Sequence, residues 1–276
     1  MNETLKESVA RPPRSPRPPR ARAALFAIAR VVALEALRGR MLWLMVALLF
    51  TGFVLTQLAA QVAITESAQI ANGVFAYWLR VTSVFVVALF VLNSMLRDWS
   101  DKGMELVLAL AVPRSVWLGG RFTGYAAVAL ACAAMCTLAI MLFISWQQAL
   151  IWGATLALEL LLVAALSMLC LLTLTHVTLG MSAVAGFYLL ARSMDAIRLI
   201  GANPLGAGQS ELHRLVVAML DAVAFVLPDL ARFARADWVM YGTASVADLG
   251  YAFGQSAIYL LLLLAAALFD LQRKVL

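Results

Sequence analysis

Two ionisable side chains stand inside long apolar stretches of this sequence, where a charge is hard to accommodate. Glu159 lies near the middle of IWGATLALELLLVAAL, and Arg80 lies near the start of an apolar stretch from about Phe75 to Leu96. A charge at the centre of a bilayer costs about 2.5–3.5 kcal/mol on insertion scales, so both residues are candidates for a path through a membrane. Glu159 can instead pair with Arg80, or form a structural hydrogen bond to a neighbouring helix, and the sequence leaves these alternatives open.

Other residues that could do chemistry are scattered. Arg192, Asp195 and Arg198 follow at intervals of three, so adjacent members are expected to pair as a structural cluster. His176 and His213 are far apart, and the three cysteines all lie in apolar stretches. We therefore expect no metal site, no disulfide framework, no catalytic residue and no cofactor on this chain.

The composition indicates what must position these side chains. Of 276 residues, 64% are hydrophobic and only 13% are charged, and the mean hydropathy is +0.91. Soluble proteins average about 45–50% apolar and about 25% charged residues, and a soluble globule of this size cannot bury such an excess. A cytosolic enzyme, a secreted domain and a disordered protein are excluded, and the excess must face lipid.

Charge-poor stretches predict an all-α polytopic membrane protein with six spans, since about 20 apolar residues cross a bilayer. The predicted spans are one between Arg40 and Glu66, one at 75–96, three within 122–191 with breaks at 145–150 and around His176, and one at 249–268.

An even number of spans places both termini on one side. The N-terminal 40 residues, the 97–121 loop and the C-terminal tail hold nine, four and two of the 21 Lys and Arg residues. Because positive charge is enriched on the cytoplasmic side, all three segments are expected to be cytoplasmic. The excess of basic residues fits contact with anionic lipid. The sequence lacks the basic surface with interleaved aromatic residues that is typical of nucleic-acid binding, so we do not expect nucleic acid as a partner.

The N-terminal region divides into two parts. Residues 1–22 contain RPPRSPRPPRAR and are predicted to be a disordered, basic, Pro/Arg-rich cytoplasmic tail. Residues 24–40 place apolar side chains on one helical face, which predicts an amphipathic interfacial helix that bends near Gly39 before the first span. The alternative is a cytoplasmic extension of that span.

Two long segments depart from plain spanning helices. In the 97–121 loop, Asp101 can cap a short apolar helix that Pro113 ends, and Gly119 and Gly120 then allow a turn. Such a helix lies on the membrane or docks into a partner's groove, and composition does not choose between the two.

The second segment, from about 199 to 249, contains an apolar run at 214–228 that is too short to cross, so we expect a re-entrant or interfacial helix. Phe233, Trp238 and Tyr241 are suited to the headgroup level.

Taken in order, these features resemble the membrane subunit of type-2 ATP-binding-cassette (ABC) transporters over residues 23–276. The elements are Glu35 and Arg38 as an E-x-x-R pair, the loop RDWSDKGMELVLALAVPRSVWLGGRFTGY and the outer segment LPDLARFARADWVMYG. Residues of the loop that match the family's plan in order are Asp101, Gly103, Glu105, Pro113, Arg114, Gly120 and Arg121. The chain has Pro-Arg-Ser where the family more often has Pro-x-Ser-Arg.

The resemblance implies a six-span permease for export in a bacterial plasma membrane, whose loop acts as a coupling helix on a separate ATPase. It assigns contact with that ATPase to Asp101, Glu105, Leu106, Pro113 and Arg114. The chain has no G-x-x-x-x-G-K-[ST], so ATP and magnesium are expected on the ATPase subunits and no enzyme activity on this chain.

A second permease subunit, identical or similar, is implied as a further partner, with Glu159 and Arg80 as candidates for the path. The alternative is a membrane scaffold or assembly factor that carries no solute. A secondary carrier is disfavoured because only Glu159 is a polar midplane candidate.

Overall fold

The fold is that of a computed structural model, which describes residues 21–62, 67–100, 113–202, 211–233, 236–243 and 245–273. These residues form helices joined by short breaks, and no strand occurs within the ranges given. Six helices are long and apolar enough to cross a membrane. The prediction of an all-α polytopic membrane protein with six spans is therefore confirmed.

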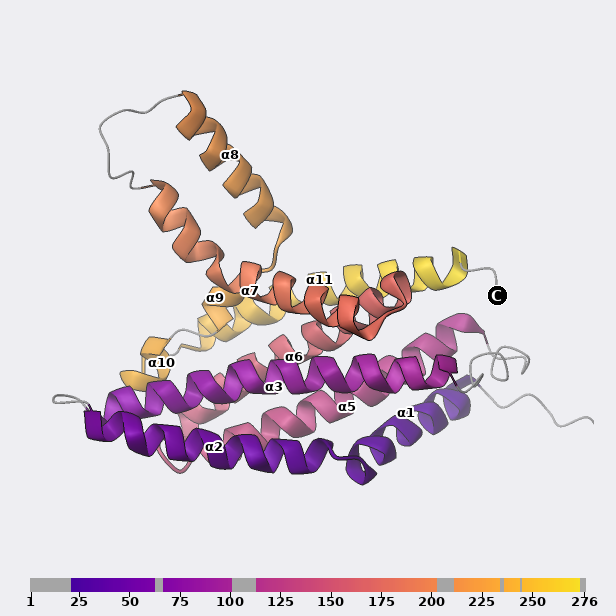
Figure 1. The fold of residues 1–276 in the computed structure, drawn as a ribbon, viewed down its shortest axis with the longest axis horizontal. Coiled ribbons are helices and arrows are strands. Elements are labelled where there is room, and N and C mark those ends of the chain that lie inside the picture. The colour runs from indigo at the N-terminus through magenta and orange to yellow at the C-terminus, as the bar shows by residue number, and fades with distance from the viewer. Residues whose placement is uncertain are drawn as a thin grey trace, which may run out of the picture.

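The six long helices form one elongated bundle (Figure 1). Their bounds are α2 (Met41–Val62), α3 (Ser67–Ser100), α5 (Arg114–Ile140), α6 (Trp146–Leu174), α7 (Val177–Ala202) and α11 (Val246–Arg273). The break between α6 and α7 consists of Thr175 and His176. The φ of Thr175 is 59°, which ends α6. This break was expected there, and His176 is exposed.

Several predicted bounds were wrong. The break between α5 and α6 lies at 141–145, before the predicted 145–150. α3 begins at Ser67, so Arg80 stands well inside it rather than near its start. α5 begins at Arg114, directly after Pro113, and the predicted turn at Gly119 and Gly120 is a continuous part of the helix.

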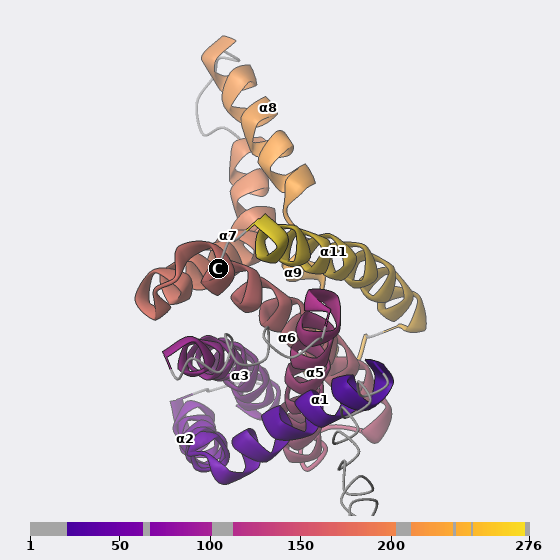
Figure 2. The same ribbon diagram turned by 90° about the vertical axis from the view of Figure 1, so that its right-hand side faces the viewer.

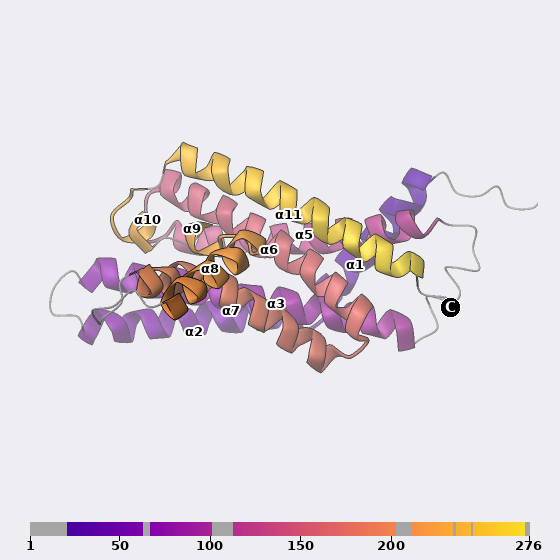
Figure 3. The same cartoon turned by 90° about the horizontal axis from the view of Figure 1, so that it is seen from above.

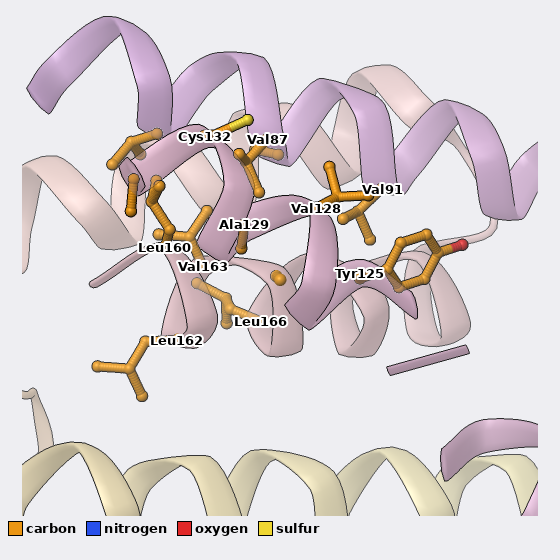
Figure 4. Close-up of a cluster of buried hydrophobic side chains, with 14 of the residues drawn as sticks. Val87, Val91, Tyr125, Val128, Ala129, Cys132, Leu160, Leu162, Val163 and Leu166 are labelled. Carbon is orange, nitrogen blue, oxygen red and sulfur yellow. The ribbon is translucent and has the colours of Figure 1, made fainter. Parts of the chain in front are cut away.

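α6 lies at the centre of the bundle. It packs against α3, α5, α7 and α11, while α2 covers the far side of α3, and the view along the bundle shows this arrangement (Figure 2). The core between α3, α5 and α6 is filled by aliphatic side chains with few polar atoms (Figure 4). Residues labelled there are Val87 and Val91 from α3, Val128 and Cys132 from α5, and Leu160 and Val163 from α6.

The amphipathic N-terminal segment is a separate helix, α1 (Ala21–Arg38), which ends at Gly39. α1 crosses α5 obliquely near one end of the bundle (Figure 2). A Cβ atom added at Gly124 would lie 2.6 Å from Cβ of Val32, and one at Gly120 would lie 3.0 Å from Cβ of Ile28. The two glycines, spaced as in G-x-x-x-G, therefore permit the close approach of α1, which gives Gly120 a packing role instead of the predicted role in a turn.

The C-terminal part of α7 leaves the bundle, and α8 (Glu211–Val226) returns beside it (Figures 1 and 3). At 16 residues α8 is too short to cross a membrane, as the sequence predicts. α9 (Leu230–Phe233) and α10 (Ala236–Met240) then pack back onto the bundle. Phe233 and Trp238 are buried against the bundle and Tyr241 is exposed, while the prediction that the three residues lie at the headgroup level stays a prediction.

The C-terminal end of α11 lies beside the N-terminal end of α5. The Arg114 guanidinium, at Nη1, donates to the carbonyl oxygens of Leu271 (3.1 Å) and Gln272 (3.2 Å). The end of α3 and the crossing of α1 occupy the same end of the bundle (Figure 1). This agrees with an even number of spans; the cytoplasmic assignment of that end stays a prediction.

The contact between α1 and α5 is tested by Gly124→Ala. At an open helical site alanine is favoured over glycine by about 1 kcal/mol, whereas overpacking costs about 1–3 kcal/mol. We expect Gly124→Ala to lower the thermal unfolding temperature of the detergent-solubilised chain. Gly186→Ala is the matched control, because a Cβ atom there meets nothing within 4 Å. Equal behaviour of the two variants would contradict the packing described.

Candidate functional site

The most buried charges of the described residues form an ion pair between α3 and α6. Nη1 of Arg80 lies 2.5 Å from Oε2 of Glu159, and the side chains are 1% and 0% exposed. The prediction that these two residues can pair is confirmed. A short charge-assisted bond offsets part of the cost of removing both charges from water.

The remaining bonds of Arg80 come from α6. Its Nη2 donates to the carbonyl oxygen of Trp152 (3.2 Å) and to Oγ1 of Thr155 (3.1 Å). The guanidinium also lies over the Trp152 ring, 5.1 Å from its centroid. Arg80 thus holds two turns of α6, and the planar guanidinium suits this fork of acceptors better than an ammonium would.

A second cation approaches the same carboxylate from α7. Nη1 of Arg192 lies 3.9 Å from Oε1 of Glu159, and its guanidinium lies over the ring of Tyr77 at 5.4 Å. The expected pairing of Arg192 within its local cluster was wrong, because Arg192 faces Glu159 while Asp195 is exposed. The side chain of Arg198 lies outside the described residues.

We call Arg80, Glu159 and Arg192 the midspan cluster. It joins α3, α6 and α7 and carries one net positive charge, since two guanidiniums face one carboxylate. Oε1 of Glu159 and Nη1 of Arg192 have no hydrogen-bond partner among the described residues, so Arg192 acts on Glu159 by charge alone. The cluster therefore fixes three helices in register through one acid.

Charge balance predicts unequal effects of substitution within the midspan cluster. Glu159→Gln leaves two buried arginines without a counter-ion, and breaking such a pair costs about 3–5 kcal/mol. Arg80→Met leaves Glu159 facing Arg192 and should cost less. Thermal unfolding in detergent measures both, with Asp195→Asn on exposed α7 surface as the control. Arg80→Met being at least as harmful as Glu159→Gln would refute the asymmetry.

A second charged network lies where α1, α3 and α5 meet. Glu35 forms an ion pair with Arg97 and accepts a bond from Oγ of Ser94 (3.0 Å), while Arg121 pairs with Asp98 and lies 4.0 Å from Glu35. We call Glu35, Arg97, Asp98 and Arg121 the end network. Its side chains are more exposed than those of the midspan cluster, Arg121 excepted.

The distance between the two clusters follows from helix geometry. Arg80 and Arg97 are 17 residues apart on α3, or about 25 Å at 1.5 Å per residue. Half the hydrocarbon thickness is about 15 Å. If the midspan cluster lies near the bilayer centre, the end network therefore lies about 10 Å beyond the edge of the hydrocarbon, at the outer boundary of the headgroup layer, where charged side chains are easily accommodated.

The sequence did not predict the end network as a set of contacts. Glu35 and Arg121 were singled out only as parts of separate elements, and Arg97 and Asp98 only as loop charges. The sequence places these two acids and two bases at helix ends on the same predicted side of the membrane. Because opposite charges at the same depth tend to pair, this balance could have indicated the network.

Only part of the predicted ATPase contact is described. Pro113 precedes α5 as its N-cap residue, and Arg114, its first residue, reaches the last carbonyls of α11. These carbonyls have no partner within their own helix, and a cation is favoured there. Asp101, Glu105 and Leu106 lie outside the described residues, as does the short helix expected around them.

The end network is tested by Glu35→Gln, which removes the charge that Arg97 and Arg121 share. Because the site is partly exposed, we expect a loss of about 1 kcal/mol, seen as faster amide hydrogen exchange in α1 and at the end of α3. Arg38→Gln is the control, since Arg38 is exposed on the same helix. Unchanged exchange in Glu35→Gln, or an equal increase in both variants, would disprove the role of Glu35.

No group of three or more His, Cys, Asp or Glu residues that could hold a metal ion occurs within the described ranges. Cys132, Cys136 and Cys170 are free thiols. Neither the comparison with protein-family models nor the comparison with curated proteins finds a match to this chain. The fold and the two charged clusters define a polytopic helical membrane protein.

Proposed function

We propose that this chain is the permease subunit of an ATP-driven type-2 ABC transport complex and that it exports its substrate. ATP hydrolysis is assigned to a separate ATPase, since the sequence has no phosphate-binding G-x-x-x-x-G-K-[ST]. Asp101, Glu105, Leu106, Pro113 and Arg114 are proposed to contact that ATPase. The proposal combines the family resemblance of the sequence with the connections at one end of the bundle.

One observation carries the proposal further than composition does: polar contacts attach both flanks of the 101–112 segment to several helices. On the α3 side, Asp98 pairs with Arg121 of α5, and Arg97 pairs with Glu35 of α1. On the α5 side, Arg114 bonds to the end of α11. A partner that moved this segment would therefore act on α1, α3, α5 and α11 together.

The midspan cluster extends this connection toward the opposite end. α3 carries both Arg97 and Arg80, and Arg80 pairs with Glu159 of α6, which also faces Arg192 of α7. Displacement of α3 along or around its axis would disturb a buried ion pair, so α6 and α7 are expected to move with it. This supports a mechanism in which rigid helices transmit the motion of an ATPase to the α7–α8 hairpin.

For Glu159 and Arg80, the burial supports a positioning role inside one subunit; a role in lining the path stays a prediction. The surface for a second permease subunit is proposed on the outer helices. α2 and α11 have the smallest buried share of the six spans and expose apolar side chains that a second copy or lipid would cover.

The proposed ATPase contact is tested by purifying the full chain from membranes of cells that make its natural partners. We expect magnesium-dependent ATPase activity to copurify, and Leu106→Asp to lower the retained activity about tenfold or more, as loss of an interface anchor does. Leu142→Asp is the matched control, because Leu142 is 81% exposed in the break at the opposite end of the bundle. Equal retention by both variants, or no ATPase activity with the unaltered chain, would refute the proposal.

Transmission is tested separately from attachment. Met219 is exposed on α8 and far from Arg114 in sequence, so Met219→Cys provides a labelling site on the outer hairpin. In the complex, we expect ATP with vanadate to change the labelling rate, and Arg114→Gln to remove the change in those complexes that retain the ATPase. A response that survives Arg114→Gln would exclude Arg114 as the link between the two ends.

A further inference from the structure

A groove of about 310 Å³ lies where the α1–α2 bend faces α3. It is separate from the midspan cluster and opens to the outside of the bundle, since Leu44 and Leu89 in its walls are exposed. The residues that line it are Glu35, Gly39, Arg40, Met41, Leu44, Val86, Leu89, Phe90, Asn93, Ser94 and Arg97. We propose that this groove binds one anionic phospholipid of the surrounding membrane.

The first argument is the order of residues along the groove. On α3 the lining residues share one helical face and change from apolar Val86, Leu89 and Phe90, through polar Asn93, to cationic Arg97. α2 runs antiparallel to α3, and the same gradient runs from Arg40, directly before α2, to apolar Leu44 within it. A molecule with an apolar tail and a charged head fits both walls.

The position of the groove along α3 sets its depth in the membrane. Val86 and Phe90 are six and ten residues from Arg80, about 9 and 15 Å along α3, whereas Arg97 is about 25 Å away. With the midspan cluster near the bilayer centre, the apolar part of the groove lies within the hydrocarbon, whose edge is about 15 Å from the centre, and Arg97 lies at the outer boundary of the headgroup layer. Trp43, 78% exposed one turn after Arg40, suits the boundary between these two layers.

The charged side chains at the polar end of the groove favour an anionic headgroup. Glu35 already faces Arg97, Ser94 and Arg121, so its carboxylate is neutralised within the end network. Arg40 is exposed, and its guanidinium makes no hydrogen bond or ion pair with any part of the chain that the structure describes. The polar end of the groove thus offers the guanidinium of Arg40, which can donate two parallel hydrogen bonds to the oxygens of a phosphate.

The proposal does not depend on transport or on an ATPase, and it is tested on the detergent-purified full chain. The chain is incubated with equal amounts of phosphatidylglycerol and phosphatidylcholine, and the bound lipid is counted by native mass spectrometry. We expect phosphatidylglycerol to be retained over phosphatidylcholine. Arg40→Gln should reduce this retention about fivefold, which is the effect of one basic residue near a lipid surface.

Two further variants separate this site from general attraction. Arg30→Gln removes an exposed arginine on α1 that does not line the groove, so it should leave retention unchanged. Val86→Phe fills the apolar end without changing charge and should reduce retention of the lipid. Unaltered melting temperatures will show that the variants are folded.

Several results would overturn the proposal. Equal losses in Arg30→Gln and Arg40→Gln would mean that surface charge alone attracts the lipid. Equal retention of phosphatidylcholine would mean an apolar groove without headgroup recognition. Displacement of phosphatidylglycerol by glycerol 3-phosphate, which has no acyl chain, at similar concentration would indicate a site for a soluble phosphate instead.

Discussion

The cost of placing charge inside an apolar bundle is the constraint on which this structure depends. Arg80 and Glu159 are both almost fully buried, and neither would be tolerated there alone. Their pairing fixes α3 against α6, and Arg192 adds α7 to the same acid. Apolar side chains of similar size can pack in several registers, whereas the bonds of Arg80 to Glu159, Trp152 and Thr155 form in one. The bundle thus gains a defined alignment from a few polar atoms.

The two charged clusters hold α3 at different positions and with different rigidity. The side chains of the end network are partly exposed, Arg121 excepted, so its contacts can exchange with water at little cost and can break and form. The midspan cluster lies where they cannot. A helix held rigidly at its centre and more loosely at its end suits a protein whose end receives a partner, and this arrangement is consistent with the proposed permease role.

Much of the fold could be predicted from the sequence because lipid imposes simple rules. Long uncharged stretches must be helices, so the six spans followed from composition. A buried acid needs a nearby base, so the pair of Arg80 with Glu159 was among the alternatives that the sequence left open, and the structure selects it. The predictions that failed concern contacts between different helices. Gly120 and Gly124 give no local sign that α1 crosses them, and Arg192 had both a near neighbour in sequence and a distant acid as possible partners. The end network joins three helices, which spacing along one helix does not reveal.

The approach of Arg192 to Glu159 has a consequence for the outer hairpin. Met194, two residues after Arg192, is the last buried residue of α7 among those described, so the midspan cluster lies close to the point where α7 leaves the bundle. Swinging the hairpin outward at this point would separate Arg192 from Glu159, while Glu159 would keep its ion pair with Arg80. The shared acid therefore restrains the hairpin, yet releasing the hairpin leaves no buried carboxylate unpaired.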